Sequence, residues 1–537
     1  MTSRPAECPH AMSVAARGPC DEGILLSAPQ AAALEPGASR WILAAAVLGS
    51  SMAFLDGSVI NVALPVIQKS LGASAAAAQW VVEAYALFLS SLVLAGGSLS
   101  DQFGRRRIFE IGVALFAAAS AACGLAGGPA ILIAARGAQG IAAALLVPSS
   151  LALLGAGFPA AERGRAVGSW SALTAIASAV GPVLGGWLVE AVSWRAVFFI
   201  NLPIAAVVLA ISRTKVAESR NPEARRLDIP GALLATAGLG GIVFGLIESA
   251  GRSWSDFRVW GSLAAGVAAL AAFGAVERGS DHPMARLALF RVRAFASANL
   301  LTFFLYAALG AAFYFLPFDL IQVRGYSPAA TGAAFLPLVL IVFALSRVAG
   351  SLSDRFGARL PLTAGPSLAA AGFGLLALSS PSGGYAATVL PPLCVLGLGM
   401  ALTVAPLTAT VLNAVDARET GAAAGINNAV ARVAGLLAIA VLGLVASGHF
   451  DRALERRLSE AGFAAPDRIV PASERRKLGA ARAPSTLSQV ERARVQEAIA
   501  RSFGESFRLV TGVAAGLALL AAASAAAGLP SGRARAE

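Results

Sequence analysis

The sequence predicts an all-α membrane protein of fourteen transmembrane helices, in which two pseudo-symmetric six-helix bundles flank two inserted helices. Composition is the first observation: 57% of the 537 residues are hydrophobic and 13% are charged, more apolar surface than a soluble core of this size would use. The second is that fourteen largely apolar segments of about 20 residues, the length of a membrane span, are separated by short polar or Gly- and Pro-containing breaks. The third is a loop motif that occurs twice.

The apolar segments are predicted to be helices rather than the strands of a membrane barrel. Ala, Leu, Gly and Val dominate them, without the alternation of polar and apolar residues that a barrel strand requires. In chain order we expect a disordered cytoplasmic tail, an N-terminal bundle, a cytoplasmic linker, the inserted helices, a second linker, a C-terminal bundle with a long external loop, and a cytoplasmic tail. These parts cover residues 1–40, 41–212, 213–228, 229–277, 278–294, 295–528 (external loop 449–507) and 529–537.

The net charge of +12 reports membrane topology and does not indicate a nucleic-acid partner. If the N-terminus is cytoplasmic, the predicted cytoplasmic loops contain seventeen Lys and Arg residues, whereas the short external loops contain five. Basic residues concentrate in the cytoplasmic loops of membrane proteins. We therefore expect both termini to be cytoplasmic.

The first predicted helix, 41–63, contains an acid where the membrane disfavours one. Asp56 lies inside the otherwise apolar run 54–65. A carboxylate at this depth costs a few kcal/mol, so it normally faces a partner or a water-filled cavity on an ion or substrate path. The alternative is a hydrogen bond that only fixes a neighbouring helix.

The second and fourth predicted helices add Glu83 and Arg136, both inside apolar segments. From their positions along the spans, Asp56, Glu83 and Arg136 are each displaced toward the outer face by about 6–8 Å. We therefore expect the three groups to share one layer, where a cation makes two buried acids tolerable. A static ion-pair cluster that joins helices is the alternative.

A polar loop motif at 97–107 follows the second helix and recurs at 350–359, after a shift of 253 residues. Its glycines permit a tight turn, its acid can cap or pair at a helix end, and its arginines hold the loop in the cytoplasm. Such an internal repeat is typical of secondary transporters, which place the substrate site between their two halves.

The fifth helix contains a proline among glycines, a pattern that bends a membrane helix and lets another backbone approach closely. We expect a hinge or tight crossing at Gly181, Pro182, Gly185 and Gly186. Near the outer end of the ninth helix, Asp319 is either a third functional acid or an interfacial residue. Arg432, near the middle of the thirteenth helix, is expected to pair with an acid or a substrate. The external loop contains two amphipathic stretches and is predicted to form a solvated hairpin or a docking surface.

Together these motifs resemble the major facilitator superfamily, and specifically its fourteen-helix drug:proton antiporter family, over nearly the whole chain. The segments that carry the resemblance are 55–65, 97–107, 136–140, 181–186 and 194–203. The antiporter motif of the fifth helix usually begins with Gly, where this chain has Ala177. The resemblance implies the major facilitator fold and a multidrug efflux function.

The resemblance also implies roles for individual residues. Asp56 and Arg136 would take part in proton coupling, and Glu83 matches a position that is acidic in some members thought to export cationic drugs. The cytoplasmic gate would be formed by the loop motif and its repeat, at Gly97, Asp101, Gly104, Arg105, Asp354 and Gly357.

From these observations we predict a secondary active transporter of the bacterial inner membrane. It would export a lipophilic organic compound in exchange for a proton by alternating access. The two acids Asp56 and Glu83 and the single cation Arg136 sum to one negative charge in this layer. This sum favours cationic cargo. We expect no cofactor beyond the proton gradient, no metal, no nucleic-acid partner and a functional monomer. Its partners would be the organic substrate, protons and the lipid bilayer.

Three alternatives stay open at this stage: an exporter of an endogenous metabolite or siderophore on the same fold, a non-transporting membrane sensor, and a membrane enzyme. An enzyme is the least favoured. His10, His282 and His449 lie in separate polar regions, the four cysteines have no C-x-x-C spacing, and no H-E-x-x-H or G-x-S-x-G motif is present. The absence of a phosphate-binding motif also disfavours an ATP-driven pump.

Overall fold

The computed structural model describes residues 38–221, 228–252, 255–280, 286–380, 383–416, 419–463 and 466–530. Within these residues the chain is almost entirely helical, and 14 helices are long and apolar enough to cross a membrane. The predicted fold class is confirmed. Most of the predicted N-terminal and C-terminal tails, and part of each predicted linker, lie outside the described residues.

The spans of the N-terminal half and the two inserted spans are single helices, except for the sixth, which is divided in two. They are α1 (Ala38–Leu71), α2 (Ala75–Phe103), α3 (Arg105–Gly124), α4 (Pro129–Gly157), α5 (Ala160–Ala191), α6 with α7 (Ala196–Phe199 and Asn201–Lys215), α8 (Ile229–Ser249) and α9 (Phe257–Gly279).

The spans of the C-terminal half follow the same order, joined by short helical turns. They are α10 (Arg293–Phe318) with the π-helical turn η3 (Asp319–Val323), α11 (Pro328–Ala334) with α12 (Leu336–Phe356), α13 (Arg359–Leu378), α15 (Leu390–Asn413), α16 (Thr420–Glu460) and α19 (Gln489–Gly528). The shorter elements are η2 (Leu287–Arg291), α14 (Tyr385–Thr388), α17 (Pro466–Ile469), α18 (Ala472–Arg475) and η4 (Leu478–Ala480).

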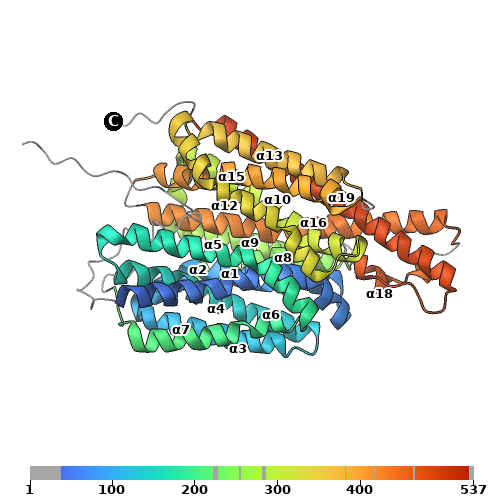
Figure 1. Cartoon of the computed structure of the whole chain (residues 1–537), viewed down its shortest axis with the longest axis horizontal. Helices are drawn as coiled ribbons and strands as arrows, with labels where there is room; N and C mark the ends of the chain where they lie inside the picture. The colour runs from blue at the N-terminus through green and yellow to red at the C-terminus, as the bar shows by residue number, and fades with distance from the viewer. Residues whose placement is uncertain are drawn as a thin grey trace, which may run out of the picture.

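The helices form two bundles that lie side by side, α1–α7 in the lower part of the view and α10–α16 above them (Figure 1). Small residues let helices approach closely within each bundle: a Cβ atom at Gly96 of α2 would overlap the backbone of Ala144 in α4. The inserted helices α8 and α9 pack mainly on each other, and α8 also contacts α2 and α16.

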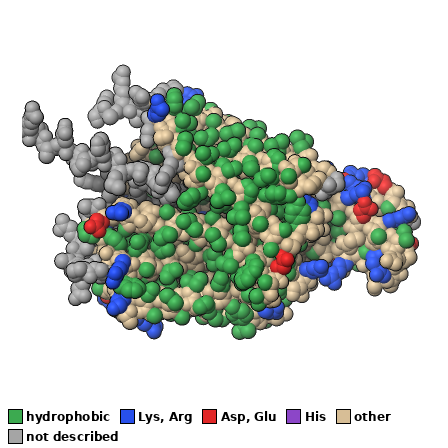
Figure 2. Space-filling view, in the orientation of Figure 1, with side chains coloured by type: hydrophobic (Ala, Val, Ile, Leu, Met, Phe, Trp, Pro, Cys, Tyr) green, Lys and Arg blue, Asp and Glu red, His purple; other side chains and the backbone are tan. Residues whose placement is uncertain are grey.

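Hydrophobic side chains cover the flank of the bundles, whereas Lys, Arg, Asp and Glu gather at the two ends (Figure 2). This distribution is that of a protein whose flank faces lipid. We call the end that carries residues 449–507 the outer end, and the end that carries the loop motif 97–107 the inner end.

At the outer end, the segment 449–507, predicted as an external loop with two amphipathic stretches, is largely helical. The segment begins as a continuation of α16 and ends as the first turns of α19, so that a helical hairpin projects from the bundle (Figure 1). Ser488 and Glu491 form a capping box that starts α19. Buried apolar side chains at helical spacing line both arms, at Phe450, Leu454 and Leu458 on α16 and at Val495, Ile499 and Phe503 on α19.

Candidate transport site

A buried ion pair joins α1 to α4. Arg136 is fully buried, Asp56 is 3% exposed, and Arg136 Nη1 donates a hydrogen bond to Asp56 Oδ2. Gln139, one helical turn after Arg136, donates from Nε2 to Asp56 Oδ1 at 3.0 Å and accepts from Arg136 Nη1 at 2.9 Å. Both carboxylate oxygens of Asp56 are therefore satisfied, and the charges of the two groups cancel inside the bundle.

The ion pair extends into a polar network that reaches three further helices. Gln139 also donates to Ser120 of α3 at 2.8 Å, and Ser120 accepts from Asn201 of α7 at 3.3 Å. On the α2 side, the Arg136 guanidinium lies 4.3 Å from the ring centroid of Tyr85. Gln139, Ser120, Asn201 and Tyr85 were not among the predicted site residues. Only Gln139 carried a signal, since it lies three residues from Arg136 on the same helix face.

Glu83 is not part of this network. It is fully buried on α2, and among the described residues neither of its carboxylate oxygens has a hydrogen-bond partner. Tyr85, two residues later and about 200° around the helix, faces Arg136. Gln79, one turn earlier on the Glu83 face, donates to the backbone of Ile439 in α16 at 2.7 Å. Glu83 therefore faces the C-terminal half, where Tyr314 of α10 lies within range of its charge.

Asp319 lies at the outer end of the C-terminal half. It is 1% exposed and accepts from Arg324 Nε at 2.7 Å. Arg324 also donates to Thr388 Oγ1 at 2.8 Å and Ser379 Oγ at 3.0 Å. This cluster joins η3 to the segment around α14. Arg432 of α16 is half-buried and lies within electrostatic range of the Tyr85 hydroxyl.

A cavity of about 420 Å³ lies between the two halves, near the middle of the helices. Its wall is mostly aliphatic and aromatic, with four polar side chains and no charged one among the described residues. The polar members are Ser58, Asn61, Ser178 and Ser346. None of the five predicted ionisable site residues lines it, although Ser58 follows Asp56 by two residues on α1.

The predicted hinge in α5 lies at two helix crossings. Cβ atoms at Gly181 and Gly185 would overlap Ser58 and Val59 of α1. Pro182 lines the central cavity, and its carbonyl contacts Gly332 of α11.

On the same crossing, Gly186 of α5 lies against the backbone of Pro328 at the start of α11. Glu190, one turn later, accepts from the backbone N–H of Ala329 at 3.0 Å. The small residues thus allow the two halves to meet closely at the outer end.

At the inner end, the two copies of the loop motif have the same backbone conformation. α2 ends at Gly104 with φ +111°, and α12 ends at Gly357 with φ +82°; both values favour glycine. Asp101 pairs with Arg105 Nε at 2.9 Å across the first turn. Gly97 lies in the last part of α2, and Asp354 lies in the last turn of α12.

A residue outside the predicted site supports the first of these turns. Glu218, after α7, accepts from the backbone N–H groups of Arg106 and Arg107, each at 3.0 Å, and so caps α3. A Cβ atom at Gly104 would lie within 3 Å of its carboxylate. The segment after α7 is thereby attached to the loop motif 97–107.

Comparisons with known proteins agree with this architecture. Residues 46–439 match the family model described as Major Facilitator Superfamily. The chain is 40% identical over 422 residues to the Multidrug resistance protein Stp of Mycobacterium tuberculosis (strain CDC 1551 / Oshkosh), covering 78% of each chain. It is 33% identical over 487 residues to the Tetracenomycin C resistance and export protein of Streptomyces glaucescens, covering 90% of each.

The fold is also that of a solved transporter. The structure of a bacterial homologue of the human lysosomal transporter Spinster, in an inward-facing and unoccupied conformation, superposes with a TM-score of 0.61 at 16% identity. The match covers 92% of this chain and 98% of that one. The predicted resemblance is confirmed, and the assignment to a transporter rather than an enzyme follows from it. The chain belongs to the major facilitator superfamily of membrane transporters.

Proposed function

We propose that this transporter exports lipophilic organic compounds, with a preference for cations, in exchange for protons by alternating access. The observation that carries the proposal is the apolar cavity between the halves, one wall of which is α1, the helix that holds the buried Asp56 paired with Arg136. The names of the relatives, which refer to drug resistance and export, support the same cargo class.

The cavity suits a lipophilic molecule of drug size. Its volume of about 420 Å³ lies in the range of small-molecule sites, which are mostly apolar with a few polar groups that orient the ligand. Ser58, Asn61, Ser178 and Ser346 would supply those polar contacts. A cation is favoured because Glu83, a carboxylate without a hydrogen-bond partner among the described residues, faces the C-terminal half.

Asp56 would couple proton binding to cargo binding through α1. A proton on Asp56 would remove the charge that balances Arg136 and break the arrangement that holds α1 against α4. Since α1 also carries Ser58, Asn61 and Val62 of the cavity wall, a shift of this helix changes the cargo site. Glu83 would be a second proton site, because an unpaired acid is far less costly to bury in its neutral form.

Alternating access would begin from the closed outer end seen here. Contacts between α5 and α11 join the halves at that end, so cargo would reach the central cavity from the inner end. We place the protein in the plasma membrane, with both termini in the cytoplasm, following the distribution of basic residues. The proton gradient would supply the energy without a cofactor, and one chain would suffice.

The test is transport in proteoliposomes with an imposed pH gradient, using matched cationic, neutral and anionic lipophilic dyes. We expect gradient-driven transport with the cationic dye preferred, and loss of the gradient dependence in Asp56→Asn and Glu83→Gln. Glu460→Gln, an exposed acid at the end of α16, is the matched control and should transport normally. Transport that stays fully gradient-dependent in both Asp56→Asn and Glu83→Gln would refute the coupling role, and absence of transport of every dye would refute the export function.

A further inference from the structure

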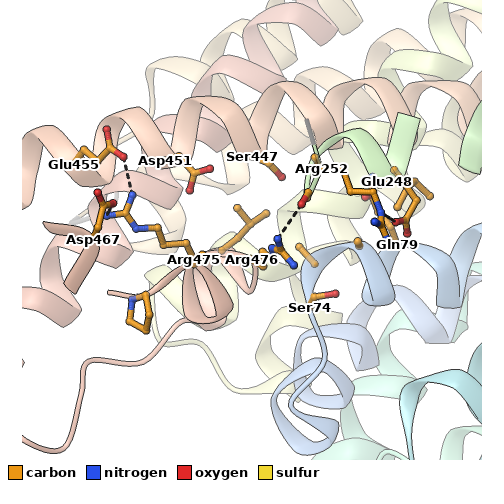
Figure 3. Close-up of a pocket in the computed structure, with 18 residues that line it drawn as sticks. Ser74, Gln79, Glu248, Arg252, Ser447, Asp451, Glu455, Asp467, Arg475 and Arg476 are labelled. Carbon is orange, nitrogen blue, oxygen red and sulfur yellow. Dashed lines mark hydrogen bonds and ion pairs between the residues drawn. The ribbon is translucent and has the colours of Figure 1, made fainter. Parts of the chain in front are cut away.

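The outer end contains a second cavity, of about 790 Å³, which shares no lining residue with the central one. It is enclosed by the start of α2, the turn between α8 and α9, the outer part of α16 and the α17–α18 segment (Figure 3). Its wall therefore comes from the N-terminal half, the inserted helices and the C-terminal half together.

Most charged groups of this outer cavity already have partners. Arg252 pairs with Glu248 at 2.7 Å. Arg475, a buried side chain, pairs with Glu455 at 2.7 Å and with Asp467 at 2.8 Å. These groups hold the wall together and leave little charge for a ligand to compensate.

In the part of the chain that the structure describes, two opposite charges of the wall form no ion pair, Asp451 and Arg476, although Asp451 lies within electrostatic range of Arg475 and Glu455. Asp451 projects from α16 between Ser447 and Glu455, and no interaction reaches it in Figure 3. Arg476 donates from Nη2 to the backbone oxygen of Gly251 at 2.9 Å. Among the described residues, neither Asp451 nor Arg476 forms an ion pair, although both line the same cavity.

We propose that the outer cavity binds a small zwitterion, such as an amino acid or short peptide, with its cationic group on Asp451 and its anionic group on Arg476. Each contact would be a charge-assisted hydrogen bond, and together they would select molecules that carry both charges. The cavity is within the size range of small-molecule sites. This inference goes beyond the proposed export function and does not depend on it.

Because the outer cavity lies where the hairpin meets the N-terminal half, a ligand bound in it would affect the rate of transport. The backbone oxygens of Arg476 and Lys477 accept from Ala75 N at 2.8 Å and from Gln68 Nε2 at 3.1 Å, which attaches the hairpin to the N-terminal half. Opening of the outer end would separate these segments and divide the cavity. A ligand that binds only the undivided cavity stabilises the closed outer end and slows transport.

Binding is tested by calorimetry on the full-length chain in lipid nanodiscs, so that no transport is needed for the readout. The probe is ε-aminocaproate, with γ-aminobutyrate as a shorter zwitterion. N-acetyl-ε-aminocaproate keeps only the anion and ε-aminocaproamide keeps only the cation. We expect each singly charged analogue to bind about tenfold more weakly than ε-aminocaproate, since each loses one charge-assisted contact.

Two variants assign the charges. In Asp451→Asn, ε-aminocaproate should bind about tenfold more weakly and no better than its N-acetyl analogue. In Arg476→Gln, ε-aminocaproate should bind no better than ε-aminocaproamide. Glu460→Gln and Arg468→Gln alter exposed charges outside the cavity and should bind the probe as the unmodified chain does.

Three results would overturn the proposal. They are no binding of either zwitterion to the unmodified chain, binding of the singly charged analogues that is as tight as that of ε-aminocaproate, or an unchanged affinity for ε-aminocaproate in both Asp451→Asn and Arg476→Gln. The comparison of analogues uses the unmodified chain, so it decides the matter even if a variant fails to fold. Failure here leaves the dye-transport test unaffected, because that test concerns the central cavity.

Discussion

The charge on Arg136 is balanced entirely within the N-terminal half. Its partners are Asp56, Gln139 and the backbone oxygen of Val81, and only Nη2 lacks a partner among the described residues. A buried pair of this kind is a poor device for stability, because both charges lose their water. In the proposed mechanism, its value lies in the large change in charge balance that protonation of Asp56 would cause.

Removing only one member of this pair should therefore cost more stability than removing both. Arg136→Met leaves the Asp56 carboxylate buried without its cation, which should lower the free energy of unfolding by about 3–5 kcal/mol. The double variant Asp56→Asn with Arg136→Met should recover most of that loss. Thermal unfolding of the purified variants in detergent measures the effect. Equal destabilisation in the single and double variants would show that packing, rather than charge, dominates.

Two features of the structure require glycine at position 104 in the loop motif 97–107: its backbone conformation and the space around it. Gly104→Ala would place a Cβ atom against the Glu218 carboxylate and force a non-glycine residue to φ +111°, a sparsely populated conformation that costs about 1–3 kcal/mol. We expect transport to fall, with partial recovery in Gly104→Ala combined with Glu218→Ala. Dye transport in proteoliposomes measures both. Gly97→Ala is the control, because its Cβ atom would have only an ordinary contact with Pro148 at 3.7 Å. If it impairs transport equally, the steric explanation fails.

At the scale of elements, composition predicts which segments form membrane-spanning helices. It does not predict the direction in which each side chain points. The positions of Asp56 and Arg136 along their spans correctly predicted that they lie close together. The same depth argument placed Glu83 beside them, whereas the turn of α2 directs it to the C-terminal half, opposite Tyr85. Position along a helix axis does not determine which face a residue occupies. The proton-coupling roles of these residues stay predictions.

The outer hairpin shows a second limit of the sequence. Apolar residues at helical spacing predicted its amphipathic arms, but the cavity they enclose depends on α17, α18 and the turn after α8. Asp451 and Arg476 come from separate elements joined by an irregular segment. No periodicity relates such residues, so their meeting could be found only from the fold.

The α18 segment should be sensitive to acid through Glu474. Burial raises the pKa of this carboxyl, but hydrogen bonds from Lys477 and from the backbone of Arg482 outweigh it, so the pKa lies below its usual value of about 4.5. A lowered pKa contributes stability that is present above the unfolded pKa and is lost as pH falls through the folded one. We expect Glu474→Gln to accelerate hydrogen exchange around residues 472–482 at neutral pH, and Glu460→Gln to leave it unchanged. Unaltered exchange in Glu474→Gln would contradict this role.

At the scale of the whole molecule, the two bundles meet at the outer end through backbones that leave no room for side chains. Gly332 of α11 lies on Pro182, and Gly186 of α5 lies on Pro328. Such a crossing stabilises one arrangement of the halves without deforming either bundle. The equilibrium between closed and open outer ends can therefore be changed by a single methyl group.

Gly332→Ala should shift the transporter toward an open outer end, because its Cβ atom would overlap the Pro182 carbonyl only when the halves are together. In a cysteine-free background carrying Ser58→Cys in the central cavity, we expect faster labelling by a membrane-impermeant thiol reagent added at the outer side. Gly374→Ala has open space around its Cβ atom and is the control. Labelling that is no faster than in this control would argue against the crossing as a closure contact.

The 41 residues of α16 run without a break from the inner part of the bundle to the tip of the hairpin. At 1.5 Å per residue this helix is about 60 Å long, so a tilt of about 10° around its inner end would displace the tip by roughly 10 Å. The hairpin is thus a lever arm that magnifies small rotations inside the membrane. A fluorophore or a bound antibody fragment at its tip would convert each transport cycle into a motion large enough to follow on single molecules.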